Sequence, residues 1–169
     1  MKHHFLPTRL HPRSKGFSLL EVLISVAILS IGLLGLAGLQ ATGMRSNHSA
    51  YLRSQATLLA YDIVDRMRAN RTAALNNSYS LDFGAPPATP AKNCAAANCE
   101  AAELAAYDLH DWFQNFTATL PSSDGEIQLN AGVVTVTVQW DETWTRIESV
   151  ANDNGTDPIT RQFVMSTQL

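Results

Sequence analysis

The chain has 169 residues, of which 46% are hydrophobic and 16% are charged. This length and composition suit one folded domain with appendages, and they exclude a chain that is disordered by composition. With 12 basic and 15 acidic side chains the net charge is −3, which argues against a nucleic-acid-binding protein because such a protein needs a basic face for the phosphates. The charge is uneven: residues 1–16 carry +4 and the remainder carries −7.

An apolar segment follows the basic residues. Residues 17–39 contain one ionisable side chain, Glu21, and no proline. A helix of this length spans roughly 34 Å, enough to cross the ~30 Å hydrocarbon core of a bilayer. Because the positive charge precedes this segment, the positive-inside rule places residues 1–16 in the cytoplasm and residues 44–169 on the far side of the membrane. We therefore expect residues 17–43 to cross the membrane.

Two ordinary targeting signals are alternatives for this segment. A cleaved signal peptide normally has an apolar stretch of about 7–15 residues that ends at small residues, whereas here 23 apolar residues run into Leu39-Gln40-Ala41-Thr42. An uncleaved signal anchor fits the length better. Glu21 counts against it, because a carboxylate inside an apolar span costs about 2.5–3.5 kcal/mol at the bilayer centre and usually has a function.

The residues around Glu21 form a motif. Lys15 and Gly16 precede the string FSLLEVLIS, in which Glu21 is the fifth residue counted from Phe17. This motif resembles the processing signal of type IV prepilins and pseudopilins. The resemblance implies that a prepilin peptidase removes residues 1–16 as a leader by cleaving between Gly16 and Phe17, and then methylates the amino group of Phe17. It also implies that Glu21 neutralises the amino terminus of a neighbouring subunit during assembly.

Helical periodicity continues beyond the apolar segment. Asp62 and Arg66 are spaced as an i,i+4 ion pair. A helix over residues 17–70 would be roughly 80 Å long, and the resemblance implies that it is the spine of a pilin fold. Arg66, Arg68 and Arg71 are interpreted as a solvated helix end that complements the helix dipole rather than as a basic binding patch. The expected core face consists of Leu52, Ala56, Leu59, Ile63 and Met67.

Residues 71–98 read as a loop, because three prolines fall between residues 86 and 90. Cys94 and Cys99 follow, and they are the only two cysteines. An even cysteine count outside the cytoplasm favours a disulfide, which would add about 2–3 kcal/mol. A metal site is the weaker alternative, because the chain offers nearby only His110 with Asp108 or Asp111 as further ligands.

The remaining elements are a helix and three strands. An apolar face predicts a second helix over residues 100–119, with Asp108, His110 and Asp111 on its solvated side. Alternating residues predict a hairpin of strands 126–130 and 133–140, followed by a last strand over residues 159–167. The fold class is therefore α+β: a long N-terminal helix, a second helix and a small antiparallel sheet.

The head has two smaller features. We expect the three tryptophans to lie in the core, with Trp144 the weakest case. Residues 153–158 are read as a turn rather than a calcium loop, because they lack EF-hand spacing.

Three strings in the head support a narrower resemblance. Residues 108–112, Leu120-Pro121 and residues 134–141 are similar to those of a class of minor pilins, the type IV pilus modification proteins. This resemblance implies a minor subunit that acts in pilus assembly or priming and in twitching or adhesion. Its partners would be the major pilin and other minor pilins. Before assembly it would sit in the inner membrane with its head in the periplasm, and afterwards in the pilus.

No catalytic motif appears in the sequence. Neither a phosphate-binding glycine loop nor a nucleophile elbow is present, so we expect no enzyme activity, cofactor or metal. The alternatives are a type II secretion pseudopilin and, from another class, a signal-anchored periplasmic binding protein.

Overall fold

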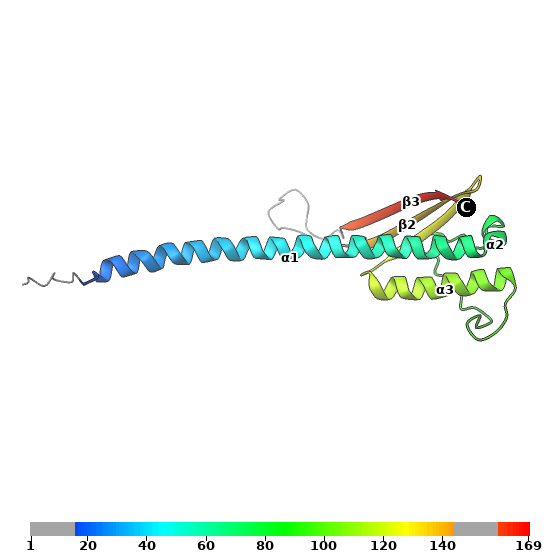
Figure 1. Cartoon of the computed structure of the whole chain (residues 1–169), viewed down its shortest axis with the longest axis horizontal. Coiled ribbons are helices and arrows are strands. Elements are labelled where there is room, and N and C mark those ends of the chain that lie inside the picture. The colour runs from blue at the N-terminus through cyan, green and yellow to red at the C-terminus, as the bar shows by residue number, and fades with distance from the viewer. Residues whose placement is uncertain (1–15, 144–158) are drawn as a thin grey trace, which may run out of the picture. The chain divides into compact units, whose positions relative to one another are not determined.

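The computed structural model describes residues 16–143 and 159–169 (Figure 1). The chain divides into two compact units, one ending at Gly43 and the other beginning at Met44. The predicted leader up to Lys15, Trp144 and the predicted turn at residues 153–158 lie outside the described residues.

Helix α1, Leu19–Ala69, contains 51 residues and contributes to both units. It begins where the backbone carbonyl of Ser18 accepts hydrogen bonds from the amides of Glu21 at 3.0 Å and Val22 at 3.2 Å. No proline interrupts this sequence, so the ladder of backbone hydrogen bonds continues without a break. The helix predicted over residues 17–70 is confirmed.

Two shorter helices follow, α2, Arg71–Leu75, and α3, Ala101–Thr119. The predicted helix over residues 100–119 is confirmed, and the Glu103 side chain accepts a bond from the Glu100 amide at 2.9 Å at its start. The loop predicted over residues 71–98 is wrong in part, because α2 occupies its beginning. A helix of five residues is too short to display a period of 3.6 in the sequence.

The sheet consists of β1, Asp124–Asn130, β2, Val133–Asp141, and β3, Thr160–Gln168. The strands are antiparallel in the order β1-β2-β3 and lie side by side in Figure 1. Ala131 and Gly132 have φ values of 52° and 81°, as the tight two-residue turns that match the twist of a hairpin require. The predicted hairpin and last strand are confirmed, and the fold is α+β.

One hydrophobic core lies within the unit that begins at Met44. The expected face of α1 is buried except at Leu59, which is half-buried. Along β2 the side chains of Val134, Val136, Val138 and Trp140 are buried, and Thr137 on the opposite face is buried as well. Trp112 and Trp140 lie in the core as predicted. The largest fully buried side chains are those of Ile63, Val64, Met67, Tyr79, Trp112, Phe116, Leu120, Ile127, Val134, Val136 and Val138.

Candidate functional site

The predicted cleavage site lies just before the start of α1. Gly16, Phe17 and Ser18 are not helical, and the helix begins at Leu19. A methyl group added at Gly16 would meet no atom within 4 Å, and the φ angle of Gly16 lies outside the left-handed region. Within the described residues, therefore, neither packing nor backbone conformation requires a glycine at this position.

The segment that follows is a helix whose apolar side chains are all uncovered. Every residue from Gly16 to Gly43 is exposed, including Phe17 at 85% and Leu39 at 73%. The helix contains an 18-residue window with a mean hydropathy of 2.5, which makes it long and apolar enough to cross a membrane. Such a surface needs a lipid or protein environment, because the apolar area in contact with water is unfavourable.

Three hydroxyl groups in this segment are satisfied by the helix itself. The Ser25 hydroxyl donates to the carbonyl of Glu21 at 2.7 Å, and the Ser30 hydroxyl donates to that of Val26 at 2.7 Å. The Thr42 hydroxyl likewise donates to the carbonyl of Gly38 at 3.1 Å. These side chains can therefore enter an apolar environment without an unpaired donor.

Glu21 differs from these residues because its carboxylate makes no hydrogen bond or ion pair with the described part of the chain. It lies in the first turn of α1, where the helix dipole favours a negative charge. It also borders a hollow on the helix surface that is lined by Phe17, Val22, Ser25, Val26 and Leu29. An unpaired carboxylate among apolar side chains can form an ion pair with a cationic group of another molecule.

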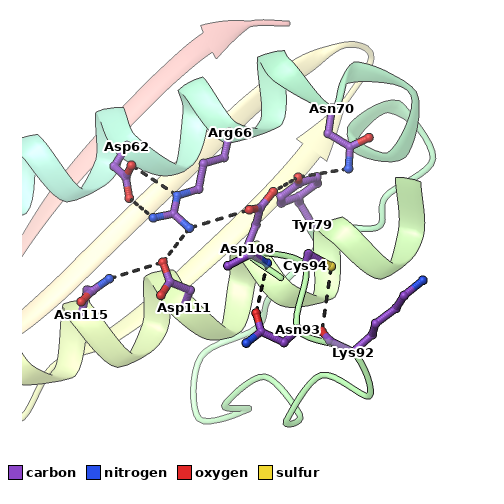
Figure 2. A network of polar contacts seen from close by, with 11 residues as sticks. Asp62, Arg66, Asn70, Tyr79, Lys92, Asn93, Cys94, Asp108, Asp111 and Asn115 are labelled. Atoms are coloured by element: carbon purple, nitrogen blue, oxygen red, sulfur yellow. Dashed lines mark hydrogen bonds and ion pairs between the residues drawn. The ribbon is translucent and has the colours of Figure 1, made fainter. Parts of the chain in front are cut away.

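In the head, Arg66 joins α1 to α3 through a cluster of ion pairs (Figure 2). Its guanidinium lies 3.2 Å from the Asp62 carboxylate, 2.8 Å from that of Asp111 and 3.7 Å from that of Asp108. Burial acts to lower the pKa of Arg66, but the hydrogen bonds to Asp111 and Asp62 outweigh it and raise this pKa. The predicted pair of Asp62 and Arg66 is confirmed.

Tyr79 extends this cluster into the segment after α2. Its hydroxyl donates to the Asp108 carboxylate at 2.5 Å and accepts a bond from the Asn70 amide at 3.2 Å. The same amide of Asn70 donates to the carbonyl of Ala101 at 2.7 Å. Burial, reinforced by the bond to Asp108, raises the pKa of the Tyr79 phenol.

These contacts correct the sequence interpretation of four side chains. Arg66 was expected at a solvated helix end, whereas its side chain is only 25% exposed and holds three carboxylates. Asp108, His110 and Asp111 were expected on a solvated face but are half-buried. Helical periodicity identifies the polar face of one helix, and it cannot reveal that a second polar face lies against it.

A second buried polar group, Glu142, was not anticipated. It follows β2 and is 2% exposed. Its carboxylate accepts bonds from the Trp140 indole at 2.9 Å and from the Ser49 hydroxyl at 3.1 Å, and it lies 3.5 Å from Nε of Arg161. A glutamate after a strand carries no sequence signal of burial, because two of its partners, Ser49 and Arg161, lie 93 and 19 positions away in the chain.

Cys94 and Cys99 form a disulfide that closes a loop ahead of α3. Nearby, Lys92 binds the Glu103 carboxylate at 3.0 Å. The backbone hydrogen bond from Glu100, and then the bond from Lys92, lower the pKa of Glu103. In the described ranges no three His, Cys, Asp or Glu side chains lie close enough together to hold a metal ion.

Two protein families match the sequence. The family described as Prokaryotic N-terminal methylation motif matches residues 11–37, and the family described as Type IV pilin Tt1218 matches residues 38–110. No curated protein and no solved structure matches the chain.

These matches show what the chain is similar to. Residues 38–110 are similar to a type IV pilin, and residues 11–37 match an N-terminal methylation motif. Type IV pilins are structural proteins and not enzymes. The motif implies processing by a prepilin peptidase, and together with the apolar helix it fits membrane anchoring before pilus assembly.

Proposed function

We propose that this chain is a minor subunit of a type IV pilus, of the type IV pilus modification (PilV) kind. It is cleaved between Gly16 and Phe17, N-methylated at Phe17, and inserted into the filament at low abundance to prime or modify assembly. Its partners are the prepilin peptidase, the major pilin and other minor pilins, and inner-membrane lipid surrounds its apolar segment before assembly. Its roles in the cell are pilus biogenesis, twitching and adhesion.

The main support for this proposal is Gly16, because neither the packing nor the backbone conformation of the described chain requires a glycine there. Gly16 has open space around it. It lies in non-helical backbone, three residues before α1 begins at Leu19. A peptidase that binds an extended backbone closely needs a residue without a side chain at this position. The requirement for glycine therefore comes from the processing enzyme rather than from the fold.

Glu21 supports the assembly step. Cleavage would create an ammonium group at Phe17, which is costly in hydrocarbon unless it finds a counter-ion. The unpaired Glu21 carboxylate of a neighbouring subunit supplies one, and the pairing gives register to a helix surface that is otherwise uniformly apolar.

The minor role, as opposed to that of a major subunit, is supported by the head strings at residues 108–112, 120–121 and 134–141. The first of these contributes Asp108, Asp111 and Trp112, which all contact α1. The string is therefore tied to the way in which this head packs on its spine.

Mass spectrometry of the N-terminal peptide, on protein produced in its own host, tests processing. Wild type should yield a peptide that begins at N-methylated Phe17, and Gly16→Val should yield uncleaved chain. Gly43→Val is the matched control, because a side chain there also meets nothing within 4 Å. An N-terminus at Met1 or near Ala41 in the wild type would overturn the proposal.

Deleting the gene tests the assignment to the pilus. Loss of piliation and twitching, restored by wild type and not by Gly16→Val, is the expected result. Loss of enzyme export with intact pili would instead identify a type II secretion pseudopilin. If neither is lost, the signal-anchored binding protein becomes the better description.

A further inference from the structure

The head unit contains a polar cavity that the filament role does not use. It has a volume of about 750 Å³ and is bordered by α1, the end of β2 and the start of β3. This volume is in the range of ligand sites, which are usually lined by apolar residues. Of the lining residues that the structure describes, Trp140 alone is apolar, so the ligand must be polar. The others are Ser49, Arg53, Glu142, Thr160, Arg161 and Gln162.

Glu142 organises the wall of this cavity. Although it is 2% exposed, both of its carboxylate oxygens lie 3.1 Å from the Ser49 hydroxyl. One oxygen also accepts the bond from the Trp140 indole at 2.9 Å, and the other lies 3.5 Å from Nε of Arg161. A buried carboxylate is stable only with such partners, and in turn it fixes Ser49 and Arg161 in place before any ligand binds.

The described lining of the cavity carries a positive charge. Arg53 is exposed, and its guanidinium makes no hydrogen bond or ion pair with the described part of the chain. Arg161 contacts Glu142 through Nε, which leaves its two terminal amino groups available. Among the described lining residues two guanidinium groups accompany one carboxylate, which gives this part of the lining an excess positive charge, although residues 44–169 as a whole contain 8 basic and 14 acidic side chains.

We propose that this cavity is a binding site for an oxyanion, a carboxylate or phosphate group held between the guanidinium groups of Arg53 and Arg161. The planar guanidinium matches two oxygens of such a group at once. Ser49, Thr160 and Gln162 provide further polar groups beside it. The oxyanion comes either from a free small anion or from a carboxylate on the acidic head of a second copy of this chain.

The binding test uses the full-length protein in detergent. Succinate and inorganic phosphate are each titrated at constant ionic strength while the NMR resonance of the Trp140 indole N–H is followed, with Trp140→Phe to assign it. We expect a saturable shift, and Arg53→Gln should weaken binding about tenfold, as expected for the loss of a hydrogen bond to a charged group. Arg161→Gln should do the same.

Arg68→Gln is the matched control, because Arg68 is a guanidinium of the same head that binds Asp65 and Thr167 away from the cavity. It should bind both anions like the wild type. A shift that never saturates would overturn the proposal, and so would equal binding by wild type, Arg53→Gln and Arg68→Gln.

Sedimentation of the same proteins identifies the source of the oxyanion. If Arg53→Gln weakens anion binding and leaves self-association unchanged, the ligand is a free anion. If it weakens both, the ligand is a carboxylate of a second copy, and added phosphate should then dissociate the wild-type complex. Each of these results supports the site.

Discussion

The side chains of the two units of this chain make different kinds of contact. In residues 17–43 every side chain is exposed, and the hydroxyl groups of Ser25, Ser30 and Thr42 bond to the helix that carries them. In residues 44–143 and 159–169 a core of apolar side chains is buried, and polar groups far apart in sequence bind one another, as Arg66 and Asp111 do. The first unit depends on its surroundings, and the second depends on its own contacts. Substitutions should therefore affect the two units differently.

The largest difference is expected for loss of a large apolar side chain. Trp112 is fully buried, stacks on Phe116 at 5.2 Å and donates to the carbonyl of Leu59 at 2.8 Å. Trp112→Ala should lower the free energy of unfolding of the head by about 3–5 kcal/mol. Leu34, which is 73% exposed, is the control, and Leu34→Ala should leave head unfolding unchanged. Calorimetry of the full-length protein in detergent measures both. Equal effects would mean that the first unit is also folded by internal contacts.

The next largest effect concerns the ion pairs. Arg66→Ala removes the cation that faces Asp108, whose side chain is 13% exposed. Because Arg66 retains some contact with water, we expect a loss of about 2 kcal/mol, less than for a fully buried pair. Asp62→Ala removes only an exposed i,i+4 partner and should cost about 0.5 kcal/mol. Urea denaturation distinguishes the two variants, and similar losses would show that the contacts across α1 and α3 contribute little.

Replacing a glycine by alanine should have a smaller effect on stability, and its sign should differ between the two units. A methyl group at Gly125 would lie 3.2 Å from the Trp112 ring, so Gly125→Ala should destabilise the head by about 1 kcal/mol. A methyl group at Gly35 would meet nothing within 4 Å. Gly35→Ala should therefore favour the helix by about 1 kcal/mol and increase the circular dichroism of helix without shifting head unfolding. A lower melting temperature in Gly35→Ala would contradict this view of the first unit.

The smallest effect near neutral pH concerns Tyr79. Because folding raises the pKa of its phenol, the resulting stability is complete below the unfolded pKa of about 10 and is lost as the pH rises through the folded value. Head unfolding measured from pH 8 to 12 should show this alkaline loss, and Tyr79→Phe should reduce it. A loss that is identical in wild type and variant would exclude Tyr79 as its source.

The features that could be predicted are those encoded by neighbouring residues. The period of α3, its start at Glu100 and the turn at Ala131 and Gly132 depend on residues a few positions apart, so the sequence reveals them. The N-terminal motif is equally local. By contrast, the pairing of Leu81 with Ile127 and the position of Arg66 between two helices depend on residues 45 or more positions apart. Composition and periodicity contain no information about such contacts.

The hydroxyl groups of Ser25, Ser30 and Thr42 have a mechanical consequence. Since each donates its proton to the carbonyl four residues earlier, it has no hydrogen left to donate to a neighbouring helix. In a filament built on this surface, adjacent helices could slide along one another under tension without breaking a hydrogen bond donated by these side chains. Resistance to stretching would then come from the ion pairs of Glu21 and from contacts between heads, so that elasticity and cohesion would reside in different parts of the subunit.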